Sequence, residues 1–205
     1  MRFRDRNEAG QKLATLLTEY KKNAVVYGLP RGGVVVAAQV ARAFDLSLDL
    51  IITRKIGHPF NPEYAIAVVA EDGCTIRNES EVAQVDPDWF RRAVSAETTE
   101  AKRRREMYLG NRPRSKTNSK TAIIVDDGIA TGLTLELAIQ EVRHLGPERI
   151  VVAVPVAPRD AADRFARLAD RFLAVEVPEV YQGAVGAYYE NFEQVTDQEV
   201  IKLLH

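Results

Sequence analysis

The feature that most constrains the fold is a set of short segments that are apolar throughout and alternate with helical patterns. One of these patterns places Val36, Val40 and Phe44 on a single side. Strands without polar alternation are buried on both faces, and their alternation with helices favours right-handed βαβ units in a parallel sheet. The predicted strands are AVVYG (24–28), DLIIT (49–53), AIAVVA (65–70), AIIV (122–125), RIVVAV (149–154) and FLAVEV (172–177). We therefore predict an α/β fold in which helices flank a parallel sheet.

The length and composition fit a single domain over residues 1–205. A formal net charge of -1 argues against a surface built throughout for nucleic acid. No apolar stretch reaches the length of a membrane span, and the N-terminal MRFRDRNEAG lacks the apolar core of a signal peptide. The single cysteine, Cys74, excludes an internal disulfide and fits a reducing compartment. We expect a cytoplasmic protein.

A basic run, KRRRE (102–106), lies within a highly charged segment, 86–109, that has a helical pattern. Glu97 and Glu100 dilute its positive charge. We interpret the segment as a solvated helix or a contact to a partner subunit, and we do not expect nucleic acid as a partner.

Three segments rich in turn formers follow predicted strands: LPRGG (29–33), RKIGHPFNPEY (54–64) and DDGIATG (126–132). In a parallel α/β sheet, ligands bind beyond the carboxyl ends of the strands. We therefore predict that all three segments are loops at one edge of the sheet and form a ligand site there.

The segment after residue 125 combines two acids with a glycine- and threonine-containing turn into a helix. Gly128 and Gly132 permit tight dihedral angles, and Thr131 and Thr134 offer hydroxyl groups. The first amides of the helix suit a phosphate, whereas Asp126 and Asp127 suit the neighbouring hydroxyls of a ribose or a divalent ion. The pattern predicts a cradle for a ribose phosphate; the alternative is a helix-capping turn with two solvated acids.

Other phosphate-binding patterns fit less well. The Walker motif GxxxxGK[ST] and the dinucleotide fingerprint GxGxxG are both absent. A receiver domain also carries paired acids at a strand end, but there the pair closes the first strand, whereas here it lies in mid-chain.

At this point the chain resembles the type I phosphoribosyltransferases, whose motif for 5-phosphoribosyl 1-diphosphate (PRPP) has four apolar residues, two acids and a small-residue loop. GLPRGG (28–33), RKIGHPFNPEYAIA (54–67), VDDGIATG (125–132) and VGAYYENFEQVTDQEV (185–200) resemble a bacterial group of this family with unassigned substrate. The resemblance implies that Arg31, Gly32 and Gly33 bind the pyrophosphate. It also implies PRPP binding by Asp126, Asp127, Gly128, Ile129, Ala130, Thr131, Gly132, Leu133 and Thr134.

The segment 54–64 corresponds to a loop that is mobile in this family and closes over the reacting sugar. Arg54, Lys55 and His58 resemble the Arg-Lys pair and later histidine of the orotate enzymes. By this resemblance Lys55 and Arg54 are catalytic, together with Asp126 and Asp127, because cations stabilise a departing pyrophosphate. The alternative is a solvated basic turn.

The resemblance places the acceptor under a C-terminal hood, mainly 172–192. Phe172 and Tyr181 are its candidate acceptor-binding residues, and Glu179 joins Asp126 and Asp127 as a candidate ligand of Mg²⁺. The alternative makes Phe172 a core residue of a strand and Glu179 a surface acid.

Purine-salvage members often carry an aspartate, used as a general base, where this chain has Ala130. The function implied is transfer of the 5-phosphoribosyl group of PRPP to a nitrogenous base or amine, with release of pyrophosphate, by a homodimer. Two alternatives stay open: a regulatory protein that binds PRPP without catalysis, and a phosphosugar hydrolase that uses the same cradle.

Overall fold

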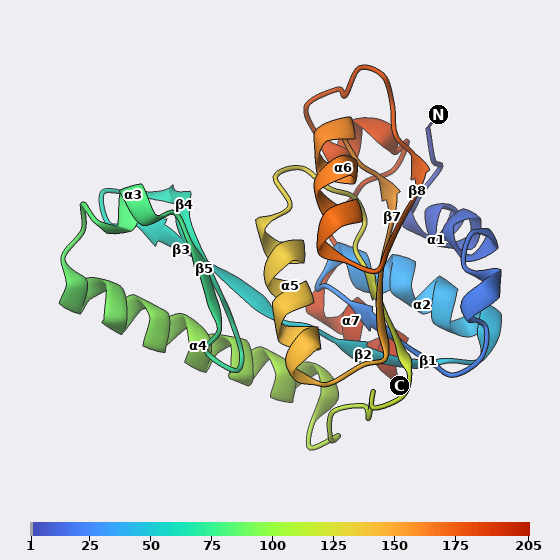
Figure 1. The fold of residues 1–205 in the computed structure, drawn as a ribbon, viewed down its shortest axis with the longest axis horizontal. Coiled ribbons are helices and arrows are strands. Elements are labelled where there is room, and N and C mark those ends of the chain that lie inside the picture. Colours follow the sequence, from blue (N-terminus) through green and yellow to red (C-terminus); the bar gives the residue numbers. More distant parts are fainter. Residues whose placement is uncertain (1) are drawn as a thin grey trace.

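The structure, a computed structural model, describes residues 2–205 and contains two sheets of different kinds (Figure 1). One is a parallel sheet with strand order β2-β1-β6-β7-β8, which confirms the predicted α/β class. Its strands are β1 (Ala24–Gly28), β2 (Ser47–Leu50), β6 (Thr121–Val125), β7 (Arg149–Val156) and β8 (Arg171–Glu176).

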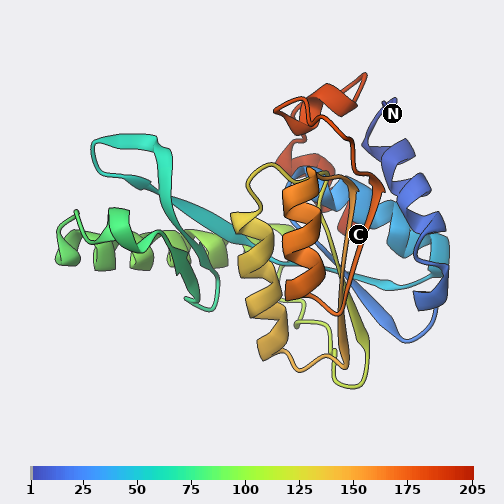
Figure 2. The same cartoon turned by 45° about the horizontal axis from the view of Figure 1, so that its top comes forward.

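Helices cover both faces of the parallel sheet (Figure 2). On one face lie α5 (Leu133–His144) and α6 (Arg159–Leu168). On the other lie α1 (Arg6–Thr15), followed by a short 3-10 turn η1 (Thr18–Tyr20), and α2 (Gly32–Phe44).

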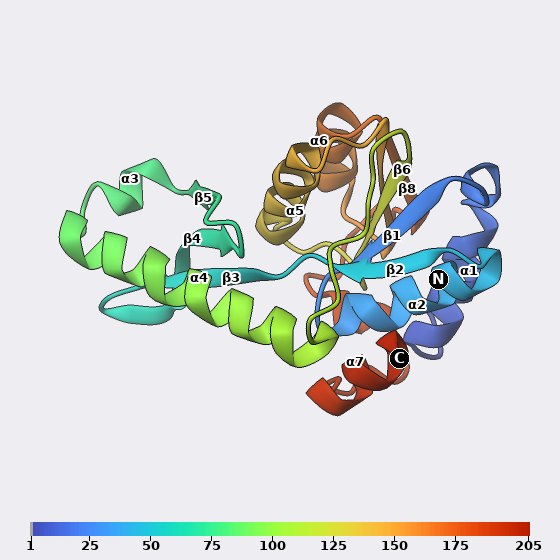
Figure 3. The ribbon, with the colours of Figure 1, turned by 90° about the horizontal axis from the view of Figure 1, so that it is seen from below.

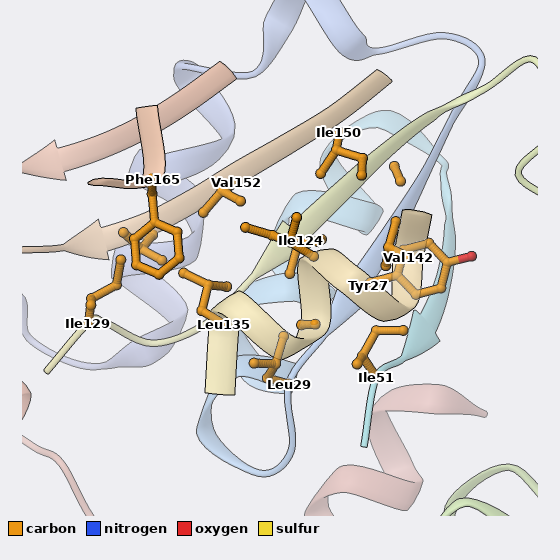
Figure 4. Close-up of a cluster of buried hydrophobic side chains, with 14 of the residues drawn as sticks. Tyr27, Leu29, Ile51, Ile124, Ile129, Leu135, Val142, Ile150, Val152 and Phe165 are labelled. Carbon is orange, nitrogen blue, oxygen red and sulfur yellow. The ribbon is translucent and has the colours of Figure 1, made fainter. Parts of the chain in front are cut away.

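The two cores follow from the alternation of side chains along each strand. Ile124 points toward α5 and α6, where it packs with Leu135 and Phe165 (Figure 4). Its neighbour Ile123 points the other way and packs with Val36 of α2. Because both faces are covered, every residue of β1 is buried, as the unbroken apolar pattern predicts.

The second sheet belongs to an extension that we call the arm, residues 53–109, which projects from the parallel sheet and its helices (Figures 1 and 3). It is antiparallel, in the order β3-β4-β5, and the long helix α4 packs along it. Its elements are β3 (Thr53–His58), β4 (Asn61–Ala70), β5 (Thr75–Arg77), α3 (Glu79–Val82) and α4 (Pro87–Leu109).

The arm corrects two predictions. The segment 54–64 is not a loop, because β3 pairs with β4 as a hairpin, and 65–70 continues β4 instead of joining the parallel sheet. The hairpin forms because Ile56 and Ile66 are buried against Phe90 of α4. The turn formers in this stretch serve only the tight connection between the two strands and an irregular register around Gly57.

The predicted hood, residues 172–192, overlaps the last strand of the parallel sheet. Residues 172–176 belong to β8, so the hood, as used below, is residues 177–192, which include the 3-10 turn η2 (Val185–Tyr188). The backbone of Phe3 pairs with residues 188–190 and joins the N-terminus to the hood. The last helix is α7 (Asp197–Leu204), which begins with a capping box between Thr196 and Glu199. Over residues 2–205, no helix combines the length and apolar character needed to cross a lipid bilayer.

Candidate active site

Two of the predicted ligand loops meet at the carboxyl ends of β1 and β6. These strands are direct neighbours, with Gly28 paired to Val125, so the residues that follow them lie side by side. Contact is close enough that a Cβ on Gly33 would lie 2.7 Å from Oδ1 of Asp126. The fold therefore brings the predicted pyrophosphate turn against the predicted ribose acids.

The two acids have different surroundings. Oδ1 of Asp126 accepts a hydrogen bond from the backbone N–H of Asp127 at 2.8 Å. Oδ2 of Asp127 accepts a hydrogen bond from Nε of Arg6 at 2.8 Å, and its backbone carbonyl accepts one from the Tyr189 hydroxyl at 2.6 Å. Asp127 is thus fixed at both its side chain and its main chain.

Burial, together with the neighbouring charge of Asp127, raises the pKa of Asp126 well above its usual range. Burial also raises the pKa of Asp127, while the Arg6 guanidinium opposes that shift. Two acids side by side are costly to ionise. A ligand that donates hydrogen bonds or positive charge stabilises their ionised form.

Arg6 is a site residue that sequence reasoning missed. Its partner lies 121 positions away, so no local spacing connects them. One sequence feature could have drawn attention to it: Arg6 is the first residue of α1, where the helix dipole disfavours a cation.

Beyond the acids, the chain turns into α5 with no side-chain cap from any of the described residues. Gly132 makes the turn with a φ of +78°, and a Cβ there would lie 2.7 Å from the Phe165 ring. The first amides of α5 therefore have no side-chain cap, and anion binding by them stays a prediction. Arg164, which the sequence did not single out, secures the turn by donating a hydrogen bond to the Thr131 carbonyl at 2.6 Å.

These groups surround a cavity of about 160 Å³. It brings together an acid from the end of β6, the turn into α5, one residue of the hood and one residue of the arm. The lining residues are Lys55, Asp126, Gly128, Ile129, Ala130, Thr131, Gly132, Thr134, Leu135 and Val185. Leu133, predicted with this group, instead packs its side chain toward Val68 and Ala70 of the arm.

The arm brings only part of the predicted basic group to the cavity. Lys55 lines it, whereas Arg54 pairs with Glu97 of α4 at 2.7 Å. Successive residues of a strand point to opposite faces, so β3 separates the two cations that a loop could have kept together. His58 lies near the hairpin turn, where its Nδ1 accepts a hydrogen bond from the backbone N–H of Phe60 at 3.3 Å.

The turn after β1 lies against the acids through its glycines. A Cβ on Gly32 would overlap Oδ2 of Asp127, so only glycine fits there. Arg31 is partly exposed, with its Nη1 4.0 Å from Oδ1 of Asp197 in α7. The peptide bond between Pro30 and Arg31 is cis.

The hood contributes differently from expectation. The Tyr181 hydroxyl donates a hydrogen bond to the Ile129 carbonyl at 3.0 Å, so it holds the turn after the acids. Phe172 does not reach the site: it pairs with Val152 near the start of β8 and packs on Phe165 in the core. The carboxyl ends of the strands lie at the opposite edge of the sheet.

A metal cage built from the protein alone is not formed. Glu179 is exposed, and no three His, Cys, Asp or Glu side chains within residues 2–205 gather as a candidate metal site. The predicted trio of Asp126, Asp127 and Glu179 is therefore not assembled.

Two acids, an uncapped helix and a glycine turn thus lie together at the carboxyl ends of strands in a parallel sheet, the architecture of a type I phosphoribosyltransferase fold. A family model described as a phosphoribosyl transferase domain matches residues 5–192, and the chain belongs to this family. The resemblance drawn from the sequence motifs is confirmed.

Individual relatives agree with the family. Two similar proteins come from Mycobacterium tuberculosis. One is "Putative phosphoribosyl transferase MT0597" from strain CDC 1551 / Oshkosh, and the other is "Putative phosphoribosyl transferase Rv0571c" from strain ATCC 25618 / H37Rv. Each is 40% identical to this chain over 205 residues. The match covers 98% of this chain and 46% of those proteins, so the chain spans about half their length.

Among solved structures, TT1426 from Thermus thermophilus is 41% identical to the chain, with a TM-score of 0.83. The match covers 100% of this chain and 98% of that one, so it includes the arm and the hood as well as the parallel sheet.

Proposed function

We propose that the protein transfers the 5-phosphoribosyl group of PRPP to a nitrogen atom of a base or amine and releases pyrophosphate. The observation that carries this proposal is the single cavity that joins Asp126, the uncapped start of α5 and Lys55, with the glycine turn of residues 31–33 beside it. These are the groups needed for a sugar that carries a phosphate at one end and a pyrophosphate at the other.

Each part of the donor has a matching surface. The backbone from Gly128 to Thr134, with the hydroxyls of Thr131 and Thr134, holds the 5′-phosphate at the N-terminus of α5. Asp126 and Asp127 accept hydrogen bonds from the ribose hydroxyls. Arg31 and the amides of the glycine turn hold the pyrophosphate.

In the reaction, the bond between C1 of the ribose and the pyrophosphate oxygen breaks, and its electron pair leaves with the pyrophosphate. The lone pair of the acceptor nitrogen forms the new bond to C1. A neutral acceptor then passes one proton from this nitrogen to solvent water, whereas an anionic acceptor releases none. Positioning and fixed charge supply most of the rate in such a transfer. We assign the stabilising cation to Lys55 and not to Arg54, because Arg54 is held by Glu97.

The acids also suit Mg²⁺, a hard cation that takes carboxylate oxygens. It is commonly held by one or two carboxylates together with substrate phosphates, and the carboxylate of Asp126 lines the cavity. Asp126 and Asp127 would hold the ion with the donor, and Mg²⁺ would neutralise charge on the departing pyrophosphate. Glu179 has no part in this proposal.

Ala130 occupies the position of a general base in purine-salvage enzymes, and its methyl group cannot accept a proton. The acceptor therefore attacks as a neutral amine or an anion, or it gives its proton to another group. A homodimer stays a prediction, which analytical ultracentrifugation tests directly.

The decisive test measures pyrophosphate release from Mg²⁺·PRPP over a panel of bases and amines, with donor binding followed by calorimetry. Release that depends on one acceptor supports transfer. Release with no acceptor supports a hydrolase, and tight binding without release supports a regulatory protein. Absence of PRPP binding at millimolar concentration overturns the assignment of the cradle.

A further inference from the structure

Arg6 has an unusual set of contacts for the first residue of a helix. Its Nε donates a hydrogen bond to Oδ2 of Asp127 at 2.8 Å, and its Nη1 donates one to the Glu193 carbonyl at 2.8 Å. The guanidinium lies 3.8 Å from the centre of the Phe192 ring. The Arg6 side chain is only 11% exposed.

These contacts do not serve α1 itself. A cation in the first turn opposes the helix dipole, and removing a guanidinium from water has a cost. All three partners lie outside the helix: Asp127 is in the acid pair, Phe192 is the last residue of the hood, and Glu193 follows it. The contacts of Arg6 with Asp127, Phe192 and Glu193 therefore explain its position better than its place in α1 does.

The ion pair between Arg6 and Asp127 packs against Gly32 of the predicted pyrophosphate turn. A Cβ built on Gly32 would lie 2.7 Å from Nε of Arg6 and would overlap Oδ2 of Asp127. The ion pair thus occupies the space that a side chain at Gly32 would fill, against the turn that is assigned to pyrophosphate. The main chain of Asp127 is held as well, because the Tyr189 hydroxyl donates a hydrogen bond to the Asp127 carbonyl.

We propose that Arg6 is a positioning residue for the phosphoribosyl donor: it fixes the Asp127 carboxylate against Gly32 and offsets one of the two adjacent negative charges. The donor carries several negative charges, and two uncompensated carboxylates would repel it. With Arg6 in place, Asp127 is held in one orientation for the sugar hydroxyls before the donor arrives, which lowers the cost of binding. This inference rests on the proposed function.

The test compares calorimetric binding of Mg²⁺·PRPP by the wild type, Arg6→Gln, Arg6→Lys and Arg6→Ala. We expect the Kd of Arg6→Gln to rise about 30-fold, within the range for a hydrogen bond to a charged group. Arg6→Lys keeps the charge but not the planar fork, so its Kd should lie between those of the wild type and Arg6→Gln. Arg4→Gln is the matched control, because Arg4 lies on the same segment but is exposed.

Two readouts separate positioning from general structural damage. Millimolar guanidinium chloride, at matched ionic strength, should partly restore donor binding to Arg6→Ala but not to Asp127→Asn. In steady state, Arg6→Gln should raise the KM for PRPP while it changes the KM for the acceptor by less than twofold. Thermal melts identify any variant that does not fold, and Arg6→Lys carries the comparison if Arg6→Gln is lost.

The outcomes are distinct. A wild type that does not bind Mg²⁺·PRPP overturns the proposed function and this inference with it. A wild type that binds, with folded Arg6 variants that bind equally well, overturns only the role of Arg6. Weaker binding of the variants without guanidinium rescue, and with both KM values raised alike, would reduce Arg6 to a structural residue.

Discussion

The protein contains one group of partly buried acids and one group of buried acids, and each has more carboxylates than cations. At the carboxyl ends of the strands, Asp126 and Asp127 share Arg6. Where the arm joins the parallel sheet, three buried acids share two arginines: Asp49, Glu71 and Glu141 with Arg105 and Arg114. We call these the site pair and the arm cluster.

The two groups differ in how the excess negative charge is relieved. In the arm cluster, arginines contact all three acids, and burial raises the pKa of Glu141 to about 7 against the attraction of Arg114, so a proton compensates the excess. In the site pair, Arg6 contacts Asp127 and not Asp126, and Asp126 lines the cavity at the start of α5.

Glu71 of the arm cluster also lines a cavity, of about 440 Å³, but Arg105 and Arg114 line it too and contact this acid. Among the described residues, Asp126 differs because it faces its cavity with no ion-pair partner. The comparison teaches that the absence of a paired cation, and not open space alone, distinguishes the site pair.

Removal of an arginine from the arm cluster should produce the largest change. Arg114 contacts both Glu71 and Glu141, which are almost completely buried. Arg114→Ala leaves Glu141 without its cation and Glu71 with Arg105 alone, and it should lower the free energy of unfolding by about 3 to 5 kcal/mol. Urea unfolding measures this loss, and calorimetry should show unchanged donor binding by the folded protein.

Arg91→Ala is the matched control for this substitution. Arg91 pairs with Asp88 on the exposed face of α4, where an ion pair contributes little to stability. If Arg91→Ala and Arg114→Ala destabilise the protein equally, the arm cluster has no special structural role.

Substitution in the site pair should have the opposite signature. Asp126→Asn removes an acceptor from the ribose hydroxyls, and we expect the affinity for Mg²⁺·PRPP to fall about 100-fold. The free energy of unfolding should stay constant or rise at pH 8, because one of two adjacent, partly buried charges is removed. Asp49→Asn should lower the free energy of unfolding, because it weakens the contact to Arg105. It should leave the affinity for Mg²⁺·PRPP unchanged, because Asp49 does not line the cavity beside Asp126. Equal loss of stability in both variants would remove the distinction between the two groups.

A pH dependence of stability should reveal the proton in the arm cluster. Burial raises the pKa of Glu141 from 4.5 to about 7, so the folded state holds this proton more tightly than the unfolded state. The resulting stabilisation is complete below pH 4.5 and is lost as the pH rises through 7. Between pH 5 and 8 the loss from Glu141 should be about 2 kcal/mol.

Glu141→Gln should remove this part of the slope, whereas Glu148→Gln, at an exposed acid, should retain it. Urea unfolding at several pH values measures both. The same slope in all three proteins would mean that Glu141 does not carry the proton.

The same contrast explains how far the sequence can predict the molecule. The site loop is predictable because its determinants are local: the acids, the glycines and the start of α5 lie within the short stretch from Asp126 to Thr134. The ion pair from Arg6 to Asp127 spans 121 positions, and no pattern along the chain encodes it. The sequence indicates a loop in the arm because the turn formers there are local, whereas the contact between Ile56 and Phe90 that stabilises the hairpin is not.

Register explains the remaining error. The position of Phe172 in the last strand suggests the acceptor site, but its height in the sheet depends on pairing with Val152. Positions only a few residues apart along β8 lie either in the core or at the carboxyl edge of the sheet, so the register decides which of them can reach the site. Glu176, further along the same strand, pairs with Val156 at the end of β7.

The smallest effect should distinguish two neighbouring cations on β3. Lys55 is exposed and lines the cavity, whereas Arg54 pairs with Glu97, much as the arginines of the arm cluster pair with their acids. Lys55→Met should lower kcat/KM for PRPP about tenfold, the loss expected for one solvent-accessible cation near a phosphate. Arg54→Met should change kcat/KM by less than twofold and act instead on the stability of the arm, read from hydrogen exchange of α4 amides. A larger catalytic effect at Arg54 than at Lys55 would mean that β3 rearranges when the donor binds, and that the mobile loop implied by the sequence describes the working state better than the hairpin.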